Sequence, residues 1–256
     1  MPTRPPLLIR KLNKFVLRRL RFFNRPGSAF YVQHRPDFDL AYGGFTPAET
    51  LQEAWAHGVE ENNRGDHNRL YFLYLNVRRL EAEGVDGDFA EVGVYKGNSA
   101  KVVHLLAPQR RLWLFDTFEG FDDADVAADP RADVKRRDFA DTSLPAVERF
   151  VGNSERVRFV QGRFPDTVAA VPQDARFALV HLDADLYEPI KAGLAFFYSR
   201  LSLGGLLIVH DYGSGHWPGA RRAVDEFFAD KPERPLLVPD KSGTVAFVKA
   251  RTPCAG

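Results

Sequence analysis

Short apolar runs alternate with helically patterned segments from Asp88 to Lys249, and this alternation limits the fold more than any other pattern in the chain. Strands that alternate with helices predict a mostly parallel α/β sheet with helices on both faces. The predicted strands are 89–93, 112–115, 157–161, 177–182, 206–209 and 245–249, and the predicted helices between them are 99–106, 189–201 and 219–228.

The segment before this region has a different character. Thr46 followed by Pro47 and Glu49 predicts a helix start with an N-cap, a proline in the first turn and an acid at N3, and this helix should end near Gly58. A second helix is expected over 67–83, where apolar residues recur at helical spacing. The predicted domains are a helical N-terminal extension (1–65), the α/β domain (66–250) and a tail (251–256), and the acid-rich segment 122–141 is expected to be a long surface loop.

Residues 1–26 mix apolar and basic residues and contain no acid. As a helix, this segment would be basic and amphipathic, which suits either the surface of an anionic membrane or packing on the domain or on a partner subunit. We favour packing. A homo-oligomer is expected, and peripheral contact with the inner face of the membrane remains the alternative.

Composition excludes several classes of protein. The 256 residues are 45% hydrophobic, enough for a sizeable core, and the formal net charge of +1 argues against a nucleic-acid partner. Cys254 is the single cysteine, so neither a disulfide framework nor a cysteine metal site can form within one chain. No apolar run is long enough to span a membrane and no secretory signal is visible, so a cytoplasmic location is expected.

A glycine-containing turn between a strand and a helix predicts a nucleotide-type cofactor. Gly93 and Gly97 would let the backbone approach a ligand, and the following helix offers free N–H groups. Asp116 ends the next strand and suits a ribose diol. A dinucleotide needs three glycines for its pyrophosphate, which this turn lacks, and Glu91 would repel a pyrophosphate but could face a cationic amino acid. S-adenosylmethionine is therefore favoured over a nicotinamide cofactor, and the alternative is a glycine turn without a ligand.

Acids and histidines follow two later strands. Asp183 follows the strand 177–182, and His210 and Asp211 follow the strand 206–209, so all three should meet at the carboxyl edge of the sheet. Such a group can bind Mg²⁺ or another divalent ion and lower the pKa of a substrate hydroxyl, with Asp183 or a histidine taking the proton.

Three further residues near these strands are ambiguous. Asp185 suits capping of the following helix, and His181, inside a strand, is expected to be buried and paired. His216 lies in the glycine-rich loop 213–219, where it is either a base or a contact in a lid.

The ordered set of motifs resembles the macrocin O-methyltransferase family, which methylates sugar hydroxyls on antibiotics and related glycosides. The resemblance covers roughly Asp66 to Lys249. Its motifs are EVGVYKG at 91–97, FDTFEG at 115–120, QGRFPDT at 161–167, LDADLYEP at 182–189, GG at 204–205, DYG at 211–213 and AVDEF at 223–227.

The resemblance implies a Rossmann-like class I methyltransferase fold with seven strands, acting on a small-molecule or carbohydrate acceptor. It implies that Glu91, Gly93 and the turn 97–99 hold the methionine part of S-adenosylmethionine, with Asp116 on the ribose. The full set of predicted cofactor contacts is Glu91, Gly93, Tyr95, Gly97, Asn98, Ser99, Asp116, Thr117, Gly162, Arg163 and Asp183, with Gly162 and Arg163 near the adenine.

The resemblance also implies Mg²⁺ dependence, with Asp183 as ligand and base and with His210 and Asp211 completing the metal site. His210 stands where the family has an acid. It therefore ligates, shifts the preference toward a transition metal, or replaces the metal as a base. The predicted catalytic residues are Asp183, His210 and His216. A phenol or catechol O-methyltransferase, a nicotinamide-dependent oxidoreductase and an inactive cofactor-binding subunit remain alternatives.

Overall fold

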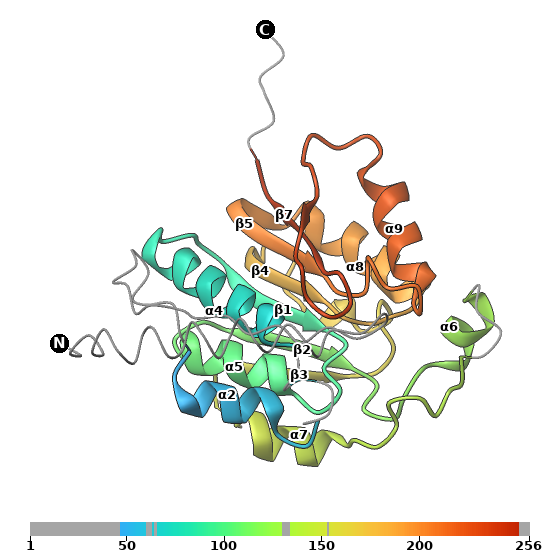
Figure 1. Cartoon of the computed structure of the whole chain (residues 1–256), viewed down its shortest axis with the longest axis horizontal. Coiled ribbons are helices and arrows are strands. Elements are labelled where there is room, and N and C mark those ends of the chain that lie inside the picture. The colour runs from blue at the N-terminus through green and yellow to red at the C-terminus, as the bar shows by residue number, and fades with distance from the viewer. Residues whose placement is uncertain (1–46, 60–62, 64–65, 130–133, 153, 251–256) are drawn as a thin grey trace, which may run out of the picture. The chain divides into compact units, whose positions relative to one another are not determined.

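A seven-stranded sheet in the order β3-β2-β1-β4-β5-β7-β6 runs through the centre of the computed structural model (Figure 1). Strands β1 to β5 are parallel to one another, and β7 is antiparallel to both β5 and β6. The structure describes residues 47–59, 63, 66–129, 134–152 and 154–250. The strands are β1 (Asp88–Val92), β2 (Leu112–Asp116), β3 (Val157–Gln161), β4 (Phe177–Leu182), β5 (Leu201–Val209), β6 (Leu236–Leu237) and β7 (Val245–Val248).

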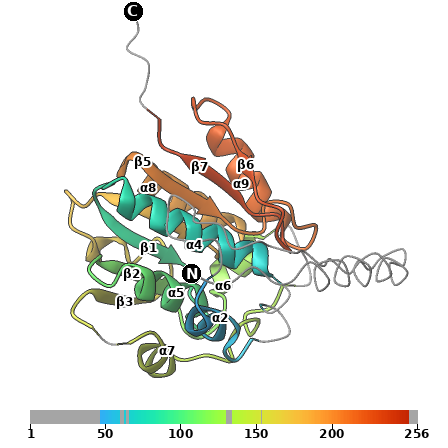
Figure 2. The same ribbon diagram turned by 60° about the vertical axis from the view of Figure 1, so that its left-hand side comes forward.

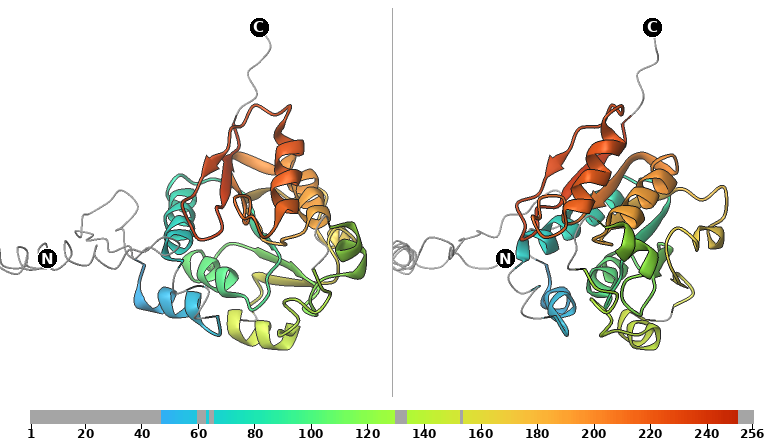
Figure 3. Two further views of the ribbon diagram at one scale, coloured as in Figure 1. Left: turned by 45° about the vertical axis from the view of Figure 1, so that its right-hand side comes forward. Right: turned by 90° about the vertical axis from the view of Figure 1, so that its right-hand side faces the viewer.

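Helices cover both faces of the sheet. Figures 1 and 2 show α4 and α5 on one face and α8 and α9 on the other, and Figure 3 shows α8 and α9 side by side. The helices are α2 (Glu49–Ala56), α4 (His67–Ala82), α5 (Asn98–Leu106), α6 (Asp123–Ala128), α7 (Leu144–Val151), α8 (Tyr187–Tyr198) and α9 (Pro218–Phe228), with a 3-10 turn at Val168–Ala170.

The two faces of the sheet carry separate apolar cores because side chains alternate along each strand. Phe89 and Leu114 pack with helices α2, α4, α5 and α7. Val92 and Phe115 pack with α8 and α9. Strands buried on both faces read as continuous apolar runs, which is why the sequence revealed them so clearly.

The start of α4 sets the position of one arginine that becomes important at the site. Asp66 is the N-cap, and its Oδ1 accepts from the backbone N–H of Arg69 at 3.4 Å. Leu70 and Leu73 are fully buried against the sheet. Arg69, one residue before Leu70, therefore lies at the edge of the buried face, in the first turn of the helix.

Several predicted bounds need correction. The segment 122–141 is not a continuous loop, because α6 begins after Asp122, whose side chain caps the N–H of Ala124 at 2.8 Å. The helix predicted over 189–201 is α8, which ends at Tyr198, and Leu201 already belongs to β5. Gly204 and Gly205 interrupt the apolar run of β5, so the sequence predicted only its second half, 206–209. The prediction also missed α7 and the two-residue β6.

Two predictions concern residues outside the described part of the chain. The basic segment 1–26 lies there entirely, so its contacts with membrane or partner stay predictions, as do the homo-oligomer and the domain bounds. Thr46, the predicted N-cap, also lies there, and α2 begins at Glu49 after Ala48. All described residues belong to one compact unit within 39–256, and α2 packs on α5. No helix of the described residues is long and apolar enough to cross a membrane.

Candidate active site

A cleft of about 420 Å³ opens at the carboxyl edge of the sheet. It lies where the chain order reverses, since β2 and β3 extend from one side of β1 while β4 and β5 extend from the other. Open α/β sheets bind ligands at such a switch point, and the volume suits a ligand of drug or nucleoside size. Residues that follow β1, β2, β4 and β5 all contribute to its lining.

The turn after β1 brings two strands into direct backbone contact. Gly93 has φ +86°, and a Cβ there would collide with the carbonyl oxygen of Asp183. The N–H of Asp183 donates to the carbonyl of Val92 at 2.8 Å. Gly97, with φ +84°, is the N-cap of α5. The glycine turn and Asp183 therefore sit against each other with no side chain between them.

Asp116 holds the glycine turn from the neighbouring strand. Its Oδ2 accepts from the backbone N–H groups of Val94 and Tyr95 at 2.6 and 2.8 Å, and its Oδ1 accepts from that of Phe118 at 2.6 Å. A carboxylate has about four acceptor positions, so these bonds leave capacity for a ribose hydroxyl. Asp116 and Thr117 both line the cleft, where the sequence expected a cofactor contact.

Glu91 is one of two predicted cofactor residues, with Gly97, that do not line the cleft. It is 2% exposed, and its Oε1 accepts from the Ser99 hydroxyl and lies 3.2 Å from Nδ1 of His181. His181 is buried and paired, as expected. Asn98 and Ser99 do line the cleft, but the Nδ2 of Asn98 donates to carbonyls at the end of α2.

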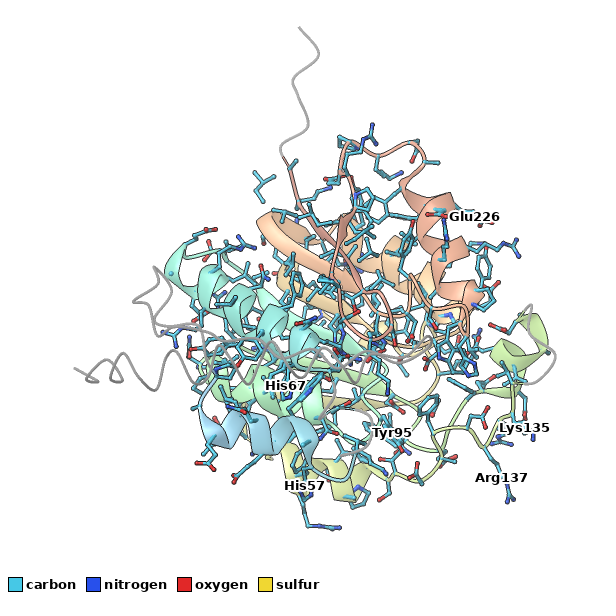
Figure 4. The ribbon with its side chains drawn as sticks, viewed as in Figure 1. His57, His67, Tyr95, Lys135, Arg137 and Glu226 are labelled. Atoms are coloured by element: carbon cyan, nitrogen blue, oxygen red, sulfur yellow. The ribbon has the colours of Figure 1, made fainter. Side chains whose placement is uncertain are left out.

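The remaining predicted cofactor residues that line the cleft are Gly93, Tyr95, Gly162, Arg163 and Asp183. Gly97 supports the turn from behind, against Val147 and Val151. Arg163 pairs with the buried Asp125, Nη2 to Oδ1, at 2.7 Å. Tyr95, labelled in Figure 4, donates from its hydroxyl to Asp141 at 2.6 Å. Cofactor contact at these positions stays a prediction.

Asp183, His210 and Asp211 meet as the sequence predicted, and Arg69 of α4 joins them. Nδ1 of His210 lies 2.7 Å from Oδ1 of Asp183 and 2.6 Å from Oδ2 of Asp211. Arg69 reaches the same group with both ends of its fork: Nη2 donates to Oδ2 of Asp183 at 2.5 Å, and Nη1 lies 2.7 Å from Nε2 of His210. We call these four residues the Arg69 cluster.

Arg69 and the two acids lie on opposite sides of the His210 ring. Nη1 of Arg69, which can only donate, faces Nε2, and the carboxylates of Asp183 and Asp211 face Nδ1. Burial and Arg69 lower the pKa of His210, but Asp183 and Asp211 outweigh them and raise it to about 9. The ring is held by its charge contacts with both acids, since the Nδ1 contacts are not aligned as hydrogen bonds.

The surroundings of Asp183 and Asp185 shift the pKa values of these two acids in opposite directions. Burial favours the neutral form of Asp183, but Arg69 and His210 outweigh it and hold the pKa of that carboxyl well below its usual range. Burial, Asp211 and Asp183 together raise the pKa of Asp185 well above its usual range. Burial lowers the pKa of Arg69, yet the surrounding acids raise it above its ordinary value. Asp183 therefore stays ionised, and the charged guanidinium of Arg69 lies beside it.

The donor atoms of this cluster meet only some of the requirements of a divalent cation. One ligand atom from each of Asp183, His210 and Asp211 lies within 4.8 Å of the others, which suits a cation. However, a histidine that ligates a metal through Nδ1 donates its Nε2–H to an acceptor. Here Nε2 faces the N–H of Arg69, and the second oxygen of Asp183 is also taken by Arg69. A divalent ion does not fit while Arg69 keeps these contacts.

Aromatic residues make up part of the lining of the cleft. We call four of them, Tyr95, Phe121, Phe139 and Trp217, the aromatic wall. Phe139 contacts the other three, with ring centroids 5.2 to 6.1 Å apart. His216, exposed and packed edge-on against Trp217 at 4.8 Å, lines the same cleft. The wall gives one side of the cleft a large apolar surface.

Sequence reasoning missed Arg69, the aromatic wall and the pairing of Asp185 with the cluster. The chain has 35 Lys and Arg residues in total, so one arginine on a helix carries no signal. A signal was present in hindsight: Arg69 follows the N-cap Asp66 by three residues and precedes the fully buried Leu70. Tyr95 was predicted as a cofactor contact, but the wall as a whole could not be found because its rings come from four separate loops.

The fold and this cleft define a class I methyltransferase architecture, in which a nucleoside-type cofactor binds beside an acid at the switch point. Residues 64–245 match the model of the macrocin-O-methyltransferase (TylF) family. The chain belongs to this family, and it is an S-adenosylmethionine-dependent O-methyltransferase. The nicotinamide-dependent alternative is thereby set aside.

Relatives and solved structures agree with this assignment. The chain is 32% identical over 219 residues to 8-demethyl-8-(2,3-dimethoxy-alpha-L-rhamnosyl)-tetracenomycin-C 4'-O-methyltransferase of Streptomyces olivaceus, covering 78% of each chain. It is 32% identical over 205 residues to mycinamicin III 3''-O-methyltransferase of Micromonospora griseorubida, covering 72% of this chain and 79% of that enzyme. The structure of the O-methyltransferase NovP superposes with a TM-score of 0.66 at 25% identity, covering 79% of this chain and 98% of that one.

Proposed function

We propose that this enzyme methylates a hydroxyl group of a sugar ring carried by a glycoside or glycan, with Asp183 accepting the proton. The observation that carries the proposal is the position of Asp183, in backbone contact with the glycine turn on one side and open to the cleft on the other. An acid so placed can reach an acceptor that lies in line with the methyl group of a cofactor held by that turn.

The proposed reaction is a direct displacement. The acceptor hydroxyl donates a hydrogen bond to a carboxylate oxygen of Asp183, and its oxygen attacks the methyl carbon. The new O–C bond forms as the S–C bond breaks, S-adenosylhomocysteine leaves, and the proton passes to Asp183. The attacking oxygen gains positive charge as the methyl group arrives, so its proton becomes acidic enough for a carboxylate of low pKa. Alignment of the two substrates supplies most of the rate.

The aromatic wall supports a sugar acceptor. A sugar ring presents C–H bonds on its faces and hydroxyls at its rim, so it matches a cleft with rings on one side and charged groups on the other. The names of the two relatives given above describe O-methylation at position 4' of a rhamnosyl-bearing compound and at position 3'' of mycinamicin III. A phenolic acceptor would also stack on the wall and is the second candidate.

The acceptor class is tested by tracing a labelled methyl group. The enzyme is incubated with methyl-labelled S-adenosylmethionine and a fractionated extract of the source cells. We expect label in a glycan, glycolipid or glycoside fraction, in an ether that resists mild base. Label in a low-molecular-weight phenol would support the second candidate. Label in no fraction would contradict the proposed function.

The role of Asp183 is tested by Asp183→Asn, which keeps the shape and removes the charge. Loss of a general base costs about 10²- to 10⁴-fold, so we expect kcat to fall by that factor. The dissociation constant for S-adenosylmethionine, measured by calorimetry, should stay within about tenfold, since the substitution leaves the backbone contact with the turn unchanged. Asp174→Asn, at an exposed position outside the cleft, is the matched control. Equal loss of turnover and cofactor binding in Asp183→Asn would refute the assigned role.

A further inference from the structure

We propose that Arg69 and His210 replace a divalent cation in this enzyme, so that methyl transfer proceeds without a metal. The inference rests on the proposed function, because the reaction whose metal dependence it describes is the proposed methyl transfer. It concerns the four side chains of the Arg69 cluster, and it differs from the metal dependence that the family resemblance implies.

The first step of the argument is the position of the guanidinium. Arg69 lines the cleft, and 11% of its side chain is exposed. Its two terminal nitrogens contact Asp183 and His210 at 2.5 and 2.7 Å, and its Cζ lies 5.2 Å from the centroid of the Trp55 ring. A planar fork held on three sides is rigid, and an arginine keeps its charge at any working pH. A permanent cation therefore already contacts the carboxylate that a metal would use.

The second step concerns His210. Its Nδ1 faces the oxygens of Asp183 and Asp211 at 2.7 and 2.6 Å, whereas its Nε2 lies 2.7 Å from Nη1 of Arg69. A metal bound through Nδ1 would need a hydrogen-bond acceptor opposite Nε2, and the guanidinium of Arg69 has only donors. Mg²⁺ also prefers oxygen ligands to nitrogen. The imidazole thus bridges the two carboxylates in the place where a bound cation would bridge them.

The third step is what Arg69 does for the reaction. It donates to Oδ2 of Asp183 and so fixes the orientation of this carboxylate at the edge of the cleft. Arg69 acts through Asp183, so it is a positioning residue rather than a catalytic one. Its charge also offsets the negative charges of Asp183 and Asp211.

Metal binding is measured first without reference to turnover. The full-length protein is stripped with a chelator, and Mn²⁺ is added while its electron paramagnetic resonance signal reports the free ion. We expect no saturable binding across the millimolar range. The double variant Arg69→Met/His210→Asp removes the guanidinium and adds an acid, and we expect it to bind Mn²⁺ at one site. Saturable binding by the wild-type protein that Asp211→Asn abolishes would overturn the proposal.

Turnover gives the second measurement, on the labelled fraction that the methyl-tracing experiment yields. We expect the stripped wild-type enzyme to be as active in excess EDTA as in Mg²⁺, within about twofold. Removal of one preorganised donor typically costs about 10²- to 10³-fold in kcat, so we expect Arg69→Met to lose that factor with little change in KM for S-adenosylmethionine. Arg69→Lys should recover part of the loss, because it restores the charge but not the fork.

The two proposals fail in different ways. Loss of activity in EDTA with recovery in Mg²⁺ would overturn the metal-free inference and leave sugar methylation intact. Absence of methyl transfer under both conditions would contradict the proposed function, and Mn²⁺ binding would still decide the inference. A merely structural role for Arg69 would lower kcat and the melting temperature of Arg69→Met and Arg69→Lys alike, which would also overturn it.

Discussion

Single residues at the carboxyl edge of the sheet must meet several structural requirements at once. Gly93 must adopt φ +86° and must also leave room for the carbonyl of Asp183. The two demands come from different strands, and only glycine meets both, because it has no Cβ and tolerates left-handed backbone.

We predict that Gly93→Ala lowers the free energy of unfolding by about 3 kcal/mol, since backbone strain of this kind costs roughly 1–3 kcal/mol before any collision is counted. Urea denaturation measures the change. Gly215→Ala is the matched control, because Gly215 has no heavy atom within 4 Å of an added Cβ and no positive φ. It should change stability by less than about 0.5 kcal/mol. An equal effect of both substitutions would show that the contact with Asp183 is unimportant.

The sequence was sufficient to locate Asp183, His210 and Asp211 together, because each follows a predicted parallel strand and such strand ends share one edge. It was insufficient for Arg69, which reaches the same edge from a helix. A side chain as long as that of arginine can end far from its Cα, and the pattern of apolar residues along α4 says nothing about where it ends. The contact of Arg69 with His210 was unpredictable for the same reason.

At the scale of elements, the cleft is divided between regular structure and loops. The acids and the glycine turn follow strands, whereas Phe121, Phe139 and Trp217 of the aromatic wall belong to loops that flank α6 and precede α9. Strand ends position side chains rigidly, so the sheet fixes the groups proposed to react, and the proposed acceptor contacts lie on the loops.

We predict that Phe139→Ala raises KM for the acceptor at least about fivefold, since burying an aromatic ring against a ligand is worth about 1 kcal/mol or more. The dissociation constant for S-adenosylmethionine should remain within about twofold. Phe139 is 40% exposed, so the fold should tolerate the change. Initial-rate kinetics with the labelled acceptor measures KM. Leu105→Ala, at a similarly exposed position outside the cleft, is the control and should have no effect.

Strands and long helices were predictable because their residues are buried on repeating faces, as in β4, where all six residues are buried. Errors arose where that periodicity fails. Helix α6 has six residues, all but one of them Asp or Ala, and its start depends on the cap at Asp122 rather than on an apolar stripe. The two residues of β6 are exposed and pair only with β7, so no pattern of buried residues marked this strand in the sequence.

At the scale of the whole molecule, cofactor binding should appear as stability. A ligand at about 100 times its dissociation constant stabilises by about 2.7 kcal/mol, which raises Tm by roughly 5–10 °C for a chain of this size. We predict such a rise with S-adenosylhomocysteine in differential scanning calorimetry. NAD⁺ should leave Tm unchanged, because the turn 93–97 has bulky residues between its two glycines and lacks the third glycine of a dinucleotide-binding motif. A larger rise with NAD⁺ would contradict the assignment of the cofactor.

The backbone contact between Gly93 and Asp183 has a consequence for how such enzymes diversify. The turn proposed to hold the methyl donor and the acid proposed to accept the proton are joined peptide to peptide across β1 and β4, so their spacing does not depend on any exchangeable side chain. Under this proposal, loops that flank α6 and α9 could be rebuilt for a new acceptor while the distance between methyl donor and acid stays the same. A change of substrate would then not require a change in the reacting groups.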